Sequence, residues 1–183
     1  PKGRIELYEK PANTRNNAVK YADFALGQFL DKASSQAYWS NTYFLIVSDH
    51  NSRVGGSMKN SGQLVPIEKF HIPGLLLGGD IKPSVFEPIM SQIDLAPSLL
   101  HLLGIDDPNP MPGHPIQLFP ENHPGRAIMQ FGNIHAYLRG NQLIVNQPYL
   151  EAQQFTLNNG HFELSKETDL GLADVAKAYA EWP

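Results

Sequence analysis

Residues 43–51, YFLIVSDHN, form an apolar run that ends at a carboxylate beside an imidazole. The run is rich in β-branched and aromatic side chains, a pattern that predicts a strand buried on both faces. Open α/β sheets bind their ligands at the carboxyl ends of such strands. We therefore expect Asp49 and His50 to lie at a rigid sheet edge where a ligand binds.

The Asp49 and His50 pair has two interpretations. A turn that begins at Asn51 can bring an oxygen donor and a nitrogen donor to one divalent cation. Alternatively, Asp49 caps the turn and His50 forms a hydrogen bond with the backbone. Because a metal site normally needs at least three protein donors, this pair is at most half of a site.

The segments around this strand have the patterns of regular elements. Apolar residues recur at helical spacing from Asn13 to Ala33, with Asn13 or Thr14 as N-cap. Residues 74–77 predict a second strand, and residues 91–104 predict a helix that closes at Gly104. Asp94, in the first turn of that helix, is explained by capping and by the helix dipole.

The last third of the chain predicts an antiparallel meander. Short strands are expected at 127–131, 134–139 and 142–146, because Gly132-Asn133 and Gly140-Asn141 favour hairpin turns. Residues 155–157 and 161–164 extend the meander, and residues 169–182 predict a final helix that packs on it.

Composition excludes several classes of protein. The 183 residues are 42% hydrophobic, which is enough for a globular core, and the net charge of −4 comes from scattered charges. Without a basic run, a nucleic-acid partner is not expected. No apolar stretch is long enough to cross a bilayer, and no signal segment opens the chain. The chain has no cysteine, which excludes disulfides and thiolate metal sites. Its start at Pro1, without Met, suggests a piece of a longer polypeptide.

Four blocks in order resemble one family. The chain is similar to the C-terminal half of the sulfatase-like hydrolases of the alkaline phosphatase superfamily, nearest the lipoteichoic acid synthase (phosphoglycerol transferase) branch. The resemblance covers about residues 13 to 113 and is faint from Pro120 onward. The blocks are residues 17–23 (NAVKYAD), 41–50 (NTYFLIVSDH), 71–73 (HIP) and 92–100 (QIDLAPSLL).

The resemblance implies a metal-dependent transfer or hydrolysis of phosphate or sulfate esters, some of them lipid-linked. Asp49 and His50 match the family's metal-binding pair, for Mn²⁺, Mg²⁺ or Zn²⁺, with Ca²⁺ in some relatives. The catalytic nucleophile, a Thr or Ser, is expected in the N-terminal half, so these residues alone should be inactive. Arg53, Asn51 and His71 are the expected substrate-binding residues; Asn51 replaces the Gly that usually follows the pair.

The predicted fold class is α/β: the C-terminal part of an alkaline-phosphatase-like sheet flanked by helices, then a small antiparallel β meander and a terminal helix. We expect part of a catalytic domain at 1–119, and the meander and helix at 120–183. The parent protein is expected at the extracytoplasmic face of a bacterial membrane, and the isolated piece, itself soluble, is expected to self-associate. A non-catalytic binding or structural domain is the alternative.

Overall fold

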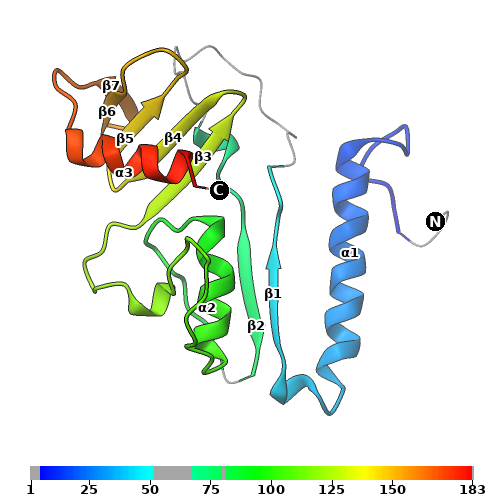
Figure 1. The fold of residues 1–183 in the computed structure, drawn as a ribbon. Coiled ribbons are helices and arrows are strands. Elements are labelled where there is room, and N and C mark those ends of the chain that lie inside the picture. Colours follow the sequence, from blue (N-terminus) through cyan, green and yellow to red (C-terminus); the bar gives the residue numbers. More distant parts are fainter. Residues whose placement is uncertain (1–4, 52–66, 80, 183) are drawn as a thin grey trace. The chain divides into compact units, whose positions relative to one another are not determined.

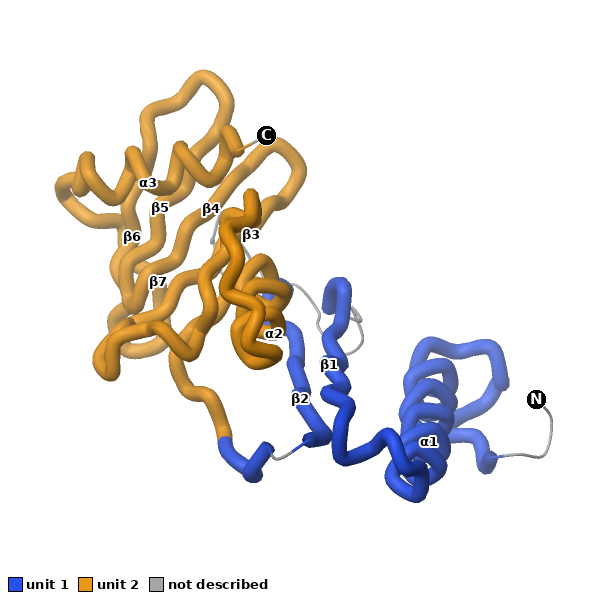
Figure 2. The backbone as a smooth tube through the Cα atoms, turned by 60° about the horizontal axis from the view of Figure 1, so that its bottom comes forward, with its two compact units in different colours: residues 1–61, 66–84 blue, residues 62–65, 85–183 orange. Residues whose placement is uncertain are grey.

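The computed structural model describes residues 5–51, 67–79 and 81–182. These form two compact units, coloured separately in Figure 2. The described residues up to 84 belong to unit 1, and residues 85–182 belong to unit 2. Along the described chain, no helix is both long and apolar enough to cross a bilayer.

Unit 1 contains one long helix and a small sheet. Helix α1 spans Arg15–Ser34, and the Thr14 side chain caps it by accepting a hydrogen bond from the Asn17 N–H, as one of the two predicted caps. The short 3₁₀ helix η1 (Trp39–Asn41) connects α1 to strand β1 (Tyr43–Val47). After η2 (Ile67–Lys69), strand β2 (Gly74–Gly78) pairs with β1.

The strands β1 and β2 are antiparallel, in a register that joins Tyr43 to Gly78 and Val47 to Gly74. The expected burial of β1 on both faces is not observed, since Val47 is 37% exposed and the rest of the strand is half-buried. The physical reason is that this sheet has two strands, and a two-stranded sheet has too few neighbours to enclose an apolar strand.

Helix α1 and strand β1 run in opposite directions (Figure 1). Their contact is at the end of α1 and the start of β1, where the ring centroids of Phe29 and Phe44 lie 5.7 Å apart. The Trp39 ring also stacks on Phe44, with the ring centroids 5.2 Å apart. The beginning of α1 and the carboxyl end of β1 consequently lie at the same end of unit 1.

Unit 2 begins with short helices and continues as a meander. The 3₁₀ helix η3 (Gln92–Asp94) leads into α2 (Leu95–Leu102), and η4 (Ile116–Leu118) follows. The meander has the strand order β3-β4-β5-β6-β7, and every neighbouring pair is antiparallel. Its strands are β3 (Arg126–Phe131), β4 (Ile134–Arg139), β5 (Gln142–Asn146), β6 (Gln153–Asn158) and β7 (His161–Leu164).

The predicted hairpins form at their glycines. Gly132 and Gly140 have φ of 60° and 58°, the left-handed region that two-residue hairpin turns require. Helix α3 (Leu170–Ala180) packs on one face of the meander, as predicted, around a core of Tyr137, Ile144 and Ala176. The expected α/β fold class, with a sheet, helices, a meander and a terminal helix, is confirmed.

Candidate functional site

Asp49 and His50 follow β1 after one intervening residue, Ser48, where the β1 and β2 ladder ends. The last ladder pair joins Val47 to Gly74, and one residue further on the Ser48 N–H donates to the Pro73 carbonyl oxygen at 3.5 Å. Backbone pairing therefore fixes the chain up to the residue before Asp49. His71 lies two residues before Pro73, so the topology brings it to the same end of the sheet.

The donor atoms of Asp49 and His50 face each other. The distance from Asp49 Oδ2 to His50 Nε2 is 3.6 Å, and the side chains are 85% and 70% exposed. Two ligands of a tetrahedral ion with bonds of about 2.1 Å are separated by roughly 3.4 Å. The two atoms are thus spaced as donors to a single divalent cation, and solvent reaches both.

A backbone hydrogen bond sets the tautomer of His50. Its Nδ1 atom lies 2.8 Å from the Asn51 carbonyl oxygen. Since a carbonyl oxygen only accepts, Nδ1 carries the proton, and in the neutral imidazole Nε2 has a free lone pair. Metal-binding histidines commonly use this arrangement, with the second ring nitrogen donating to a carbonyl group.

Asp49 divides its two oxygens between two roles. Oδ1 accepts from the His50 N–H at 2.9 Å, which caps the turn, and Oδ2 faces the imidazole. The structural interpretation of the pair is therefore correct in its local contacts. Those contacts leave Oδ2 and Nε2 3.6 Å apart and exposed to solvent, so they are compatible with metal binding.

The remaining parts of the predicted site are a third metal donor and the residues expected to bind substrate, Arg53, Asn51 and His71. Within residues 5–51, 67–79 and 81–182, no group of three His, Cys, Asp or Glu side chains could hold an ion, so the third donor stays unassigned. Asn51 is half-buried and supplies its carbonyl oxygen to His50, and His71 is exposed. Arg53 lies outside the described residues. Their roles in substrate binding stay predictions.

Asp94 has a structural role, as its position in the first turn of the predicted helix indicated. It is fully buried, accepts from the Ser91 N–H at 3.0 Å and completes a capping box with Ser91. Its partner Arg126, 32 residues away, donates to both carboxylate oxygens at 2.8 and 2.9 Å. Sequence reasoning missed this ion pair because Arg126 looks locally like any charge at a strand start.

Comparison with known proteins extends these observations. A family model described as sulfatase matches residues 3–105, which include α1, β1, Asp49, His50 and α2. A lipoteichoic acid synthase-like protein of Bacillus subtilis (strain 168) is 24% identical over 103 residues, 48% of this chain and 16% of that protein. An arylsulfatase of Clostridium perfringens is 31% identical over 103 residues, 52% of this chain and 21% of that protein.

A solved structure covers almost the whole chain. A protein in the alkaline phosphatase superfamily from Vibrio parahaemolyticus is 38% identical, with a TM-score of 0.85 over 98% of this chain. The match spans 43% of that chain, and the chain likewise spans only a minor part of the curated relatives. These relatives therefore contain extensive further sequence outside the matched region.

Proposed function

Because the chain belongs to the sulfatase family, we propose that it is the C-terminal part of a metal-dependent enzyme that transfers or hydrolyses phosphate or sulfate esters. The family is one of sulfate and phosphate ester hydrolases and transferases. The observation that carries the proposal is the pairing of Asp49 Oδ2 with His50 Nε2 at 3.6 Å, inside the matched region and at the end of β1.

In this proposal Asp49 and His50 are two ligands of a divalent ion, Mn²⁺, Mg²⁺, Zn²⁺ or Ca²⁺. The ion would lower the pKa of the attacking hydroxyl and neutralise charge on the ester oxygens. Asp49 supplies a negative charge through Oδ2, and the Asn51 carbonyl oxygen holds the ring of His50 in the orientation and tautomer that binding needs. Arg53, Asn51 and His71 are the proposed contacts to the substrate.

The proposal places the nucleophile and at least one further metal ligand in another part of the polypeptide. Two donors bind a divalent ion poorly, so residues 1–183 alone should neither hold the ion tightly nor turn over substrate. The solved relative, which continues well beyond the matched region, supports a division of the site between two parts of one chain.

The resemblance to the lipoteichoic acid synthase branch also supports a location and a kind of substrate. We propose that the parent protein acts at the extracytoplasmic face of a bacterial membrane and that its ester substrate is in some cases lipid-linked.

The test is calorimetric titration of Mn²⁺ and Zn²⁺ into the full-length protein, combined with hydrolysis of nitrophenyl phosphate and nitrophenyl sulfate. The Asp49→Ala/His50→Ala variant should lose tight binding of the ion. Its activity should fall about 1,000-fold or more, since the ion supplies several kcal/mol of transition-state stabilisation.

The chain contains a matched control for this variant. His101 and Asp106 form a second His–Asp pair in unit 2, half-buried at His101 and exposed at Asp106, with Nδ1 and Oδ1 2.6 Å apart. The His101→Ala/Asp106→Ala variant should keep ion binding and activity. If the Asp49→Ala/His50→Ala variant retains both, the pair is structural and the protein is better described as a binding or structural module.

A further inference from the structure

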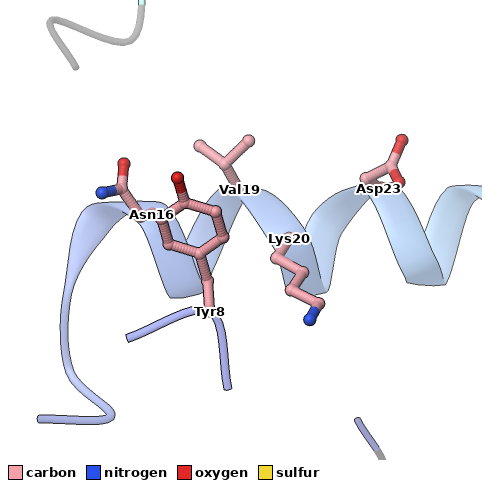
Figure 3. A pocket seen from close by; sticks show the side chains of 5 residues that line it. All are labelled: Tyr8, Asn16, Val19, Lys20 and Asp23. Atoms are coloured by element: carbon pink, nitrogen blue, oxygen red, sulfur yellow. The ribbon is translucent and has the colours of Figure 1, made fainter. Parts of the chain in front are cut away.

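A groove along the side of α1 in unit 1 has no role in the chemistry proposed so far. It has a volume of about 310 Å³ and is lined by Tyr8, Asn16, Val19, Lys20 and Asp23 (Figure 3). Four of these residues come from successive turns of α1, and Tyr8 comes from the segment before the helix. In Figure 3 the Tyr8 ring lies over the first turns of α1, between Asn16 and Val19.

A buried asparagine fixes the segment that carries Tyr8. Asn17 is only 6% exposed, and its Oδ1 accepts from the N–H groups of Tyr8 and Glu9 at 2.7 and 3.3 Å. Its Nδ2 donates to the carbonyl oxygens of Glu9 and Pro11 at 2.8 and 3.1 Å. A carboxamide can make about four hydrogen bonds, so the capacity of this side chain is fully used.

The clamp by Asn17 leaves the Tyr8 side chain available. The backbone of Tyr8 is fixed, but its side chain is 67% exposed, and that of Val19 is 52% exposed. A tyrosine side chain has only two rotatable torsions, so a ring on a held backbone loses little conformational freedom when a ligand stacks on it. The groove therefore has a preorganised apolar floor.

The polar lining selects the class of ligand. Lys20 and Asp23 carry opposite formal charges that cancel, so the groove has no net attraction for an anion. Asn16 both donates and accepts, Lys20 donates and Asp23 accepts. A sugar ring matches this set, because one face presents C–H groups to an aromatic ring while its hydroxyls donate and accept at the edge. The volume, at the lower end for ligand pockets, suits one ring.

The groove and the candidate metal site lie toward the same end of unit 1. From the contact between Phe29 and Phe44, Val19 lies ten residues back along α1, about 15 Å at the helical rise. Val47, the last residue of β1, lies three residues forward from Phe44, about 10 Å at the strand rise, and Asp49 follows two residues later. Since α1 and β1 run in opposite directions, both distances extend toward the same end of unit 1 (Figure 1).

We propose that this groove, lined by Tyr8, Asn16, Val19, Lys20 and Asp23, binds a neutral sugar ring. Its role as the subsite for the sugar part of an ester whose phosphate or sulfate lies at Asp49 and His50 rests on the proposed function. Tyr8 supplies the stacking face, and Asn17 is a positioning residue that acts through the Tyr8 backbone.

The test uses the full-length protein and methyl glucopyranoside as the neutral sugar probe, observed by saturation-transfer NMR. We expect a dissociation constant of about 1–10 mM. Tyr8→Ala should weaken binding about tenfold or more, whereas Tyr8→Phe, which keeps the ring, should stay close to the wild type. Inorganic phosphate should not compete for the groove, since its lining has no net charge.

Tyr149→Ala is the matched control, because Tyr149 is a fully exposed tyrosine of unit 2 and its loss should leave sugar binding unchanged. The sugar-site proposal would be overturned if the wild type and Tyr8→Ala bound methyl glucopyranoside equally well. It would also be overturned if the wild type did not bind this sugar. The Asp49→Ala/His50→Ala variant separates the two proposals. If it keeps ester activity while Tyr8→Ala loses sugar binding, the sugar site is supported and the proposed function fails. If it loses ester activity while Tyr8→Ala keeps sugar binding, the proposed function is supported and the sugar site fails.

Discussion

At the scale of single residues, the buried carboxylate of Asp94 joins three separate segments of unit 2. Its Oδ1 accepts from the His114 N–H at 2.9 Å, and its two oxygens accept from the two Nη atoms of Arg126. Asp94 is 0% exposed and Arg126 is 5% exposed. Removing one partner of such a pair leaves an uncompensated buried charge, which costs more than the intact pair contributes.

We therefore expect Asp94→Asn to lower the free energy of unfolding by about 3–5 kcal/mol. Asp106→Asn, which removes a carboxylate paired to His101 at the surface, should cost at most about 1 kcal/mol. Urea denaturation of both variants measures the difference. Equal small losses in the two variants would mean that the Arg126 guanidinium finds other partners.

At the scale of elements, aromatic stacking holds α3 against the meander. The rings of Tyr137 on β4 and Tyr179 on α3 lie 5.6 Å apart and nearly parallel, and the Arg126 guanidinium lies 5.1 Å from the centre of the Tyr179 ring. Burial, followed by the neighbouring Tyr179, raises the pKa of Tyr137 above its ordinary value of 10.0. The folded state thus favours the neutral phenol.

This raised pKa predicts a loss of stability in alkali. The contribution of Tyr137 is fully present below pH 10.0, the ordinary value, and is lost as the pH rises through the higher pKa of the folded state. The urea midpoint should fall between about pH 9 and about pH 11, and Tyr137→Phe should show a smaller fall. Tyr149→Phe, at a fully exposed position, should behave like the wild type. An unchanged pH dependence in Tyr137→Phe would contradict the assignment.

At the scale of the whole molecule, unit 1 leaves large apolar side chains in water. Phe29 on α1 and Leu75 on β2 are 49% and 47% exposed, although the periodicity of α1 predicts a covering face. A two-stranded sheet is marginal without further strands or a covering layer. We propose that another part of the same polypeptide covers these side chains in the parent protein.

Residues 1–183 alone should consequently self-associate. Sedimentation should show an average mass that rises with concentration, and Leu75→Lys should reduce the rise by charging the exposed sheet. Leu118→Lys, at an exposed leucine in η4, is the matched control and should have little effect. A monomeric mass at every concentration would contradict this prediction, because it would show that the exposed apolar side chains of unit 1 do not drive association.

Short-range sequence patterns predicted the local elements and the Asp49 and His50 half of the candidate site. Helix α1 follows from its periodicity and the Thr14 cap, the meander follows from alternation and the glycine turns, and the adjacency of Asp49 and His50 is covalent. Each depends on residues a few positions apart, so short-range patterns record it. The division into domains at residue 119 stays a prediction.

Contacts between distant residues become visible once the chain is folded in three dimensions. The pairing of Asp94 with Arg126 and the antiparallel register of β1 with β2 both depend on how separate segments of the chain meet. No local pattern marks Arg126 as the partner of Asp94, because many charged residues would fit a strand start equally well. Burial of β1 failed as a prediction for the same reason: an apolar sequence shows that a strand can be buried, but the neighbouring elements decide whether it is.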